Sequence, residues 1–113
     1  MADCLFCSIV AEEIPADIVL SNDDVVAFRD IAPQAPVHVL VVPRDHHANV
    51  GELASAAPAT TATLLQAAQE VAADEGVGDA YRVVFNTGAG AGQTVFHLHV
   101  HVIGGRPLAW PPG

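Results

Sequence analysis

The stretch 93-QTVFHLHVHVI-103 places three of the chain's six histidines, His97, His99 and His101, at strictly alternating positions. Every residue between them is apolar. Alternate side chains of a β-strand point to the same face, so the pattern predicts a strand over residues 95–103 with one face of imidazoles and one face in the core. The predicted core residues of this strand are Phe96, Leu98, Val100 and Val102.

The row of imidazoles is too long to serve one metal ion, because its neighbours lie about 6.6 Å apart along a strand and its ends about twice that. An exposed polar face that happens to use histidine is an alternative, but other polar residues fill such faces more readily. A neutral imidazole is a competent nucleophile near neutral pH, since its ordinary pKa is ~6.5. Attack on phosphorus gives a covalent intermediate, and a neighbouring imidazole can bind phosphate oxygens or move a proton. The row therefore indicates phosphoryl chemistry with divided roles.

A glycine-rich loop, 86-NTGAGAGQT-94, comes directly before the histidine strand. Its backbone N–H groups, together with the Gln93 amide and the Thr94 hydroxyl, are suited to holding a phosphate at one end of the row. It is not a Walker A loop, because no Gly-Lys-Ser/Thr follows and it opens a strand instead of a helix. Taken alone, the loop is equally consistent with a plain hairpin.

The rest of the chain predicts an antiparallel α+β fold. Consecutive apolar segments with short turns and no βαβ rhythm predict strands, and an apolar stripe that starts at a proline predicts one long helix. A length of 113 residues suits a single domain over residues 1–113. The expected strands are residues 18–20, 25–28, 37–42 and 81–85, and the expected helix is residues 58–74.

The charge balance excludes some partners. Thirteen acidic residues stand against four arginines, and no lysine is present, which leaves a net charge of −9. Nucleic acids and anionic membranes attract basic surfaces, so we expect neither as a partner. A phosphorylated ligand would be held by local donors and not by the overall field. The segment MADCLFC lacks the features of a secretory signal, so a cytoplasmic location is expected.

Cys4 and Cys7 form a CxxC pair, the only cysteines of the chain. A disulfide is disfavoured in the cytosol, and a thioredoxin-like motif needs a preceding strand that the sequence does not offer. Two buried thiols without further function remain an alternative. A zinc site is favoured, because CxxC supplies two thiolates and the chain has spare histidines to complete a Cys₂His₂ set.

Together, these motifs resemble the Hint branch of the histidine triad (HIT) superfamily. The His-x-His-x-His row with apolar residues between and after is the signature of that superfamily, and the likeness extends over nearly the whole chain. The matching segments are 30-DIAPQAPVH-38, 42-VPRDH-46, 86-NTG-88, 92-GQTV-95, 97-HLHVHVI-103, 104-GGR-106 and 110-WPPG-113.

The resemblance implies a HIT fold, with a five-stranded antiparallel sheet, one long and one short helix, and a homodimer whose sheets join into ten strands. It also implies hydrolysis of the P–N bond of purine nucleoside phosphoramidates, which releases a nucleoside monophosphate and an amine. Position by position, His99 would be the nucleophile, and His101 and His38 would bind the phosphate and assist proton transfer.

The remaining site residues are likewise implied by the resemblance. Asp30 would hold the ribose hydroxyls, Phe28 and Ile31 would lie near the base, and Trp110 would dock near the partner's active site. The residues implied around the phosphate and leaving group are Asn86, Gly92, Gln93 and Thr94. The implied zinc ligands are Cys4, Cys7, His46 and His97, with His47 as a rival for His46.

Some positions depart from the Hint pattern, and other functions stay open. Thr94 replaces a common serine, Arg44 replaces a lysine, and Ala89 and Ala91 replace commoner polar residues, which leaves the leaving-group preference open. A dinucleoside polyphosphate hydrolase is the nearest alternative, although the Trp-Pro-Pro-Gly ending favours Hint. A nucleotide-binding or scaffold protein with incidental turnover, and a zinc-dependent interaction module, are alternatives of other classes.

Overall fold

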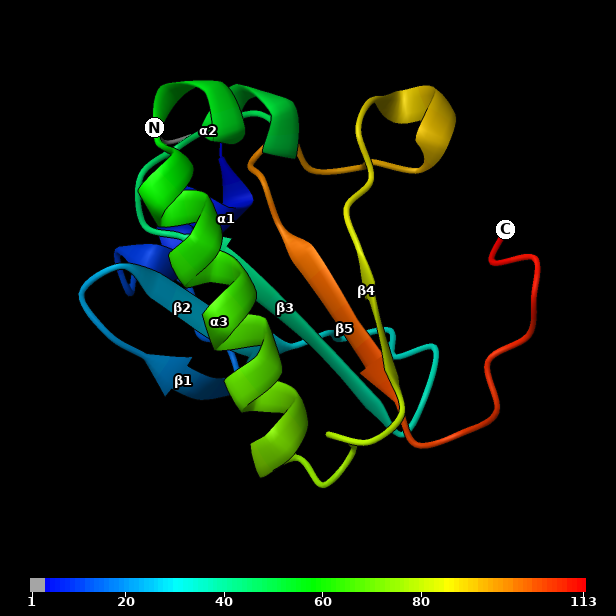
Figure 1. Cartoon of the computed structure of the whole chain (residues 1–113). Helices are drawn as coiled ribbons and strands as arrows, with labels where there is room; N and C mark the ends of the chain where they lie inside the picture. Colours follow the sequence, from blue (N-terminus) through cyan, green and yellow to red (C-terminus); the bar gives the residue numbers. More distant parts are fainter. Residues whose placement is uncertain (1–3) are drawn as a thin grey trace.

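A computed structural model describes residues 4–113, so the first three residues of the domain expected over 1–113 lie outside the described residues. One antiparallel sheet with the strand order β1-β2-β3-β5-β4 forms the centre of the molecule (Figure 1). The predicted antiparallel α+β class is therefore confirmed. The strands are β1 (Ile18–Ser21), β2 (Val25–Arg29), β3 (Val37–Pro43), β4 (Tyr81–Val84) and β5 (Val100–Gly104).

The long helix α3 (Pro58–Asp74) has the predicted bounds. Pro58 suits the first helical position because its missing N–H would have no partner there, and Gly76 follows the helix at φ +81, a conformation that favours glycine. A 3₁₀ turn, Ala89–Ala91, lies in the glycine-rich loop. No helix within residues 4–113 has the length and apolar character needed to cross a bilayer.

Two short helices are present, α1 (Leu5–Val10) and α2 (Val50–Ala56), where only one short helix was expected. The Cys4 sulfur caps α1 by accepting from the Cys7 N–H at 3.3 Å. Asn49 caps α2 by accepting from the Glu52 N–H at 2.9 Å, and the Glu52 carboxylate accepts from the Ala48 N–H. The arrangement resembles a capping box, although the Glu52 carboxylate bonds the N–H of Ala48 and not that of the N-cap Asn49; the signal lies in the sequence at 49–52, and our interpretation missed it.

The sheet is covered on both faces. α3 packs against one face, on a core of alternate strand residues such as Val25, Val39 and Val102. On the opposite face, α1 contributes Phe6 and Ile9 to a smaller core. Its buried residues are Phe6, Ile9, Val26, Phe28, Leu40 and Val42. All of β3 is buried, as its continuous apolar sequence predicts for a central strand with both faces covered.

The histidine strand is shorter than the predicted range of 95–103. β5 begins at Val100, where its pairing with β3 ends at Val41; β3 continues to Pro43 beside β2, whereas residues 95–99 lie outside the strand and bend at 95–97. Loop groups bind this backbone instead: the Leu98 N–H donates to the His47 carbonyl at 2.6 Å. The prediction was wrong for Phe96, which is 52% exposed, whereas Leu98, Val100 and Val102 are buried as predicted.

Candidate active site and metal-binding cluster

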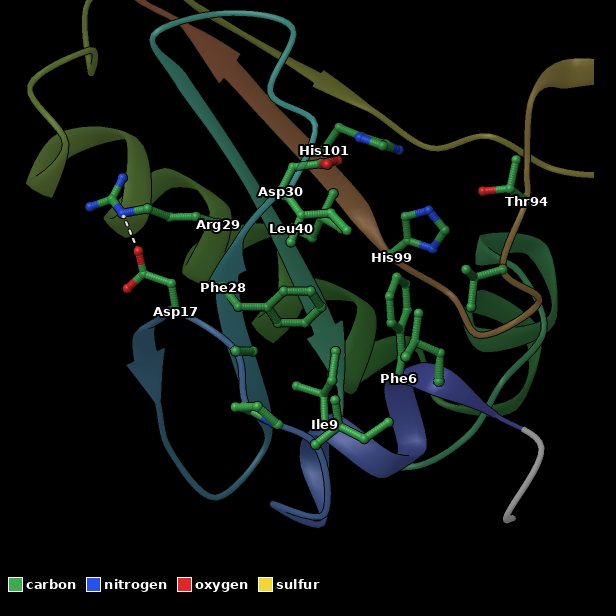
Figure 2. Close-up of a pocket in the computed structure, with 16 residues that line it drawn as sticks. Phe6, Ile9, Asp17, Phe28, Arg29, Asp30, Leu40, Thr94, His99 and His101 are labelled. Atoms are coloured by element: carbon green, nitrogen blue, oxygen red, sulfur yellow. Dashed lines mark ion pairs between the residues drawn. The ribbon is translucent and has the colours of Figure 1, made fainter.

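A pocket of about 690 Å³ opens on the face of the sheet that α1 covers (Figure 2). Its walls come from α1, the segment 14–17, the end of β2, and the bent segment that precedes β5. The volume falls within the usual range for small-molecule sites, ~300–1,000 Å³. Six of the predicted site residues line it: Phe28, Asp30, Ile31, Thr94, His99 and His101.

His99 is buried and held in one orientation at the back of this pocket. Its Nδ1 lies 2.8 Å from the carbonyl oxygen of His97. A carbonyl only accepts, so Nδ1 carries the proton and donates, and Nε2 keeps an unprotonated lone pair. The ring of Phe6 packs perpendicular to the His99 ring, as Figure 2 shows, with centroids 4.9 Å apart. The result is a fixed imidazole with one nucleophilic nitrogen.

His38 and His101 form a hydrogen-bonded pair with the opposite tautomer. The backbone N–H of Gln34 donates to His38 Nδ1 at 3.0 Å, so neutral His38 carries its proton on Nε2. That Nε2 lies 2.8 Å from His101 Nδ1, which must therefore accept. Neutral His101 then carries its own proton on Nε2. This N–H is the group that His101 offers to a ligand in the pocket.

Burial keeps both members of the pair neutral. It lowers the pKa of His101 to about 4, with the nearby His99 and His38 imidazoles acting in the same direction. Burial also lowers the pKa of His38, against an opposing effect of the Asp30 carboxylate. One Asp30 oxygen lies 3.4 Å from His38 Nε2, and the other accepts from the Ala32 N–H at 2.8 Å. At neutral pH His101 is thus a hydrogen-bond donor without a positive charge.

Arg29 also lines the pocket, but its charge is already paired. Its guanidinium forms an ion pair with Asp17 at 3.3 Å, drawn in Figure 2, and bonds the Glu75 carboxylate as well. A phosphate in this pocket would therefore meet imidazoles, a hydroxyl and backbone groups before it met a free guanidinium. Local donors are therefore what this pocket offers to a phosphorylated ligand.

A second cluster lies beside the pocket and consists of two thiols and two imidazoles. The potential ligand atoms of Cys4, Cys7, His46 and His97 all lie within 4.8 Å of one another. His97 donates its Nε2–H to the Pro43 carbonyl at 2.9 Å, so its unprotonated Nδ1 points at the sulfur atoms, 3.5 Å from Cys4 and 3.4 Å from Cys7. Burial lowers the pKa of His97, which keeps it in the neutral form that binds metal.

The same cluster separates His46 from its neighbour. His46 Nδ1 lies 3.3 Å from the Cys7 sulfur. His47 instead turns toward the carboxylate of Glu52, at 3.8 Å, and its carbonyl accepts the Leu98 N–H. Two sulfur and two nitrogen donors at these spacings fit a tetrahedral ion such as zinc. The four residues therefore form a group that could bind a metal.

Comparisons with known proteins agree with this arrangement. Residues 11–108 match the family described as "HIT domain". A HIT-like protein from Synechococcus elongatus is 52% identical over 111 residues, which cover 98% of this chain and 97% of that protein. The chain belongs to the HIT family.

Solved structures of HIT proteins share the fold. A HIT family hydrolase from Legionella pneumophila superposes with a TM-score of 0.94 at 44% identity, covering 98% of this chain and all of that one. A histidine triad nucleotide-binding protein from Sulfolobus tokodaii, described as hypothetical, superposes at 0.76 with 35% identity, covering 88% of this chain and 67% of that one.

The glycine-rich loop of this HIT chain is held from within by Gln93. The Gln93 amide oxygen accepts from the Gly88 N–H, and its nitrogen donates to the carbonyls of Ala48 and Val95. These bonds use both N–H groups of the amide, so the side chain supports the loop. Asn86 lies beside Gly92, but neither residue is part of the pocket wall, whereas Thr94 is.

Besides Asn86, Gly92 and Gln93, two further expected residues stand apart from the pocket wall, and two others were missed. His38 bonds His101 but does not itself line the wall, and Trp110 lies on the C-terminal tail, 83% exposed. The interpretation of the sequence overlooked Phe6, which stands between the two cysteines of CxxC, and the backbone N–H of Gln34. No motif marks the function of a backbone group. Phe6 had a local signal, an aromatic residue inside the metal-binding motif.

Proposed function

We propose that this HIT-family chain is a hydrolase that cleaves the P–N bond of purine nucleoside phosphoramidates through a nucleotide covalently bound to His99. The observation that carries the proposal is the pairing of opposite tautomers in one pocket. His99 presents a lone pair on Nε2, and His101, with ring centroids 5.0 Å away, presents an N–H. A phosphorus centre needs a nucleophile, and its oxygens need a donor. These two nitrogens supply both.

In the first step, His99 Nε2 attacks phosphorus and the P–N bond breaks as the leaving amine takes up a proton. The imidazole of His99 becomes positively charged, and the His97 carbonyl that accepts its Nδ1–H stabilises this charge. His101 Nε2–H donates a hydrogen bond to a phosphate oxygen, and the leaving amine takes its proton from solvent water, because a neutral imidazole that lost its N–H would become an anion. In the second step, water attacks phosphorus, the bond from phosphorus to His99 Nε2 breaks, and the proton lost by the water passes to solvent, so that the nucleoside monophosphate leaves and His99 is neutral again.

The pocket wall supports a nucleotide as the substrate. Phe28 and the fully exposed Ile31 offer apolar surface for a purine base, and Asp30 offers a carboxylate for the ribose hydroxyls. The nucleotide-binding name of the Sulfolobus protein points in the same direction. Around the phosphate we assign the Thr94 hydroxyl and backbone groups of the loop, with Asn86, Gly92 and Gln93 shaping that loop.

We further propose that zinc occupies the cluster of Cys4, Cys7, His46 and His97 as a structural ion. These residues would tie α1 to the segment after β3 and to the bent segment before β5. A bound ion of this kind contributes to folding and takes no part in the chemistry. The reduced thiols of such a site suit the cytoplasm.

The proposal includes a homodimer of the single HIT domain. The sheets of two copies would join, and the tail that bears Trp110 would reach the pocket of the partner. The support is the likeness of the tail to Hint proteins and the exposure of Trp110, whose apolar area is too large to favour water.

A turnover panel tests the activity. Adenosine and guanosine phosphoramidates are compared with diadenosine polyphosphates, and the protein is quenched within the first turnover for mass spectrometry. We expect faster cleavage of phosphoramidates and a nucleotidyl adduct. Preference for diadenosine polyphosphates would identify a polyphosphate hydrolase instead. Tight nucleotide binding without turnover would identify a binding protein.

A further inference from the structure

The turn that follows β5 contacts the loop between β2 and β3. The Arg106 Nε–H donates to the carbonyl of Gln34 at 2.9 Å, and a second guanidinium nitrogen donates to the Pro107 carbonyl at 2.9 Å. The arginine thus folds over its own turn and reaches across to the loop. It links two segments that lie 72 residues apart in the sequence.

Gly105 makes a second contact with the same loop. Its φ of +91 is a conformation that residues with side chains rarely adopt. A Cβ built at this position would also lie 3.0 Å from the Cβ of Pro36, closer than normal contact. Glycine therefore lets the turn approach the loop. Arg106 and Gly105 together support the loop from one side.

The other side of this loop faces the histidine pair. The Gln34 N–H donates to His38 Nδ1, and the Gln34 side chain donates to the Ala32 carbonyl. Ala32 in turn donates its N–H to Asp30. The residue that Arg106 holds by its carbonyl is thus the residue whose N–H determines where the His38 proton resides.

We propose that Arg106 and Gly105 are positioning residues that keep the His38–His101 pair in the tautomer with a proton on each Nε2. The hydrogen bond between the two rings couples them. If the Gln34 N–H moved away, His38 could carry its proton on Nδ1 and accept at Nε2. His101 would then donate from Nδ1 and turn a lone pair, in place of an N–H, toward the pocket. A lone pair repels a phosphate oxygen.

Because the two rings are coupled, the Arg106 hydrogen bond should affect turnover more than it affects stability. A hydrogen bond of this kind contributes little to the free energy of unfolding, since Arg106 is exposed. This hydrogen bond selects, however, between two tautomer arrangements of the buried His38–His101 pair. One arrangement presents an N–H to the ligand, and the other presents a lone pair. Arg106→Gln should thus lower kcat by roughly fivefold, the equivalent of one ordinary hydrogen bond, with little change in Tm.

Long-range ¹H–¹⁵N spectra of the full chain with labelled histidine test the proposal without substrate. Wild type should show proton-bearing Nε2 and unprotonated Nδ1 for both His38 and His101. Arg106→Gln and Gly105→Ala should show averaged nitrogen shifts for this pair. Arg44→Gln is the matched control, because Arg44 bonds the β1–β2 turn at Ser21 and Asn22 and should leave the pair unchanged.

Unchanged tautomers in Arg106→Gln would overturn the proposal, and this exposed substitution should fold even where Gly105→Ala does not. Only the kinetic expectation rests on the proposed function. Shifted tautomers in a chain that hydrolyses no phosphoramidate would refute the function and leave the positioning role standing. Normal phosphoramidate turnover, together with tautomers that stay the same in Arg106→Gln, would support the function and refute the positioning role.

Discussion

The rings of Phe6 and His99 stand perpendicular to one another, at 89°, with their centroids 4.9 Å apart. Phe6 also packs against Phe28 at 5.4 Å. Because Phe6 lies in α1 between Cys4 and Cys7, one aromatic ring connects the candidate metal-binding cluster with the proposed nucleophile and the proposed base site. The position of α1 therefore bears on the orientation of His99.

Phe6→Leu should lower kcat by about three- to tenfold, since an edge-on aromatic contact contributes ~0.5–1.5 kcal/mol beyond its buried area. Leucine keeps most of the apolar volume, so the protein should stay folded. Steady-state kinetics and thermal unfolding measure the two effects. Phe96→Leu, at an exposed phenylalanine, is the control and should change neither. Equal kcat values for both variants would show that Phe6 does not help to orient His99.

Substitutions along the histidine row should give unlike phenotypes. His99→Ala should abolish turnover and the covalent adduct while the chain stays folded and retains metal, because it removes only the nucleophile. His97→Ala should lose metal and thermal stability first, since His97 Nδ1 points at the two thiols. Rapid-quench mass spectrometry and metal analysis distinguish them. An adduct on His97, or metal lost in His99→Ala and kept in His97→Ala, contradicts the assignment.

Protein purified without chelator should contain about one equivalent of zinc per chain. Removal of the ion should lower Tm and loosen α1, because two of the four ligands lie at the start of that helix. Cys4→Ser should have the same effect. Emission spectrometry together with thermal unfolding provides the measurement. A fully folded protein with free thiols and no bound metal would contradict the proposed zinc site.

The stability contributed by neutral His101 should be lost as the pH falls from about 6.5 toward 4. In this window the unfolded chain binds a proton at His101, while the folded chain, whose pKa for this group is lowered to about 4, does not. Protonation therefore favours unfolding until the folded form also titrates. The His101→Gln variant has no group that titrates at this position, so it should not show this loss of stability. The difference between wild type and variant in urea-unfolding free energy should shrink from pH 7 to pH 4.5, and a constant difference would refute the prediction.

Deletion of residues 108–113 should alter relative rates across a panel of amine leaving groups more than it alters Tm. In the described chain, Trp110 is exposed and the tail runs away from the sheet beyond β4 (Figure 1). Its one hydrogen bond to the strands joins the Arg82 guanidinium to the Ala109 carbonyl, among the contacts described for residues 4–113. A uniform change in all rates would place the tail away from the leaving group.

Local patterns predicted much of the fold because each depended on neighbours in the chain. Apolar runs and a proline start located four of the five strands and α3 to within one residue. The prediction failed at residues 95–99, where alternation alone suggested a strand. A strand needs a paired neighbour, and the pairing of β3 with β5 stops at Val41 and Val100, although β3 itself continues to Pro43. The alternation was a poor guide at Phe96 for the same reason.

The sequence by itself determined the kinds of groups in this protein: an imidazole row, a thiol pair, a glycine-rich loop and a sheet to hold them. Only the tertiary structure decided their roles. His46 joins the thiols and His47 does not, and His99 and His101 carry their protons on different nitrogens. These outcomes depend on carbonyl and N–H groups at Pro43, His97 and Gln34. Backbone groups are the same in every residue, so their effect on a distant ring is set by folding and not by residue type.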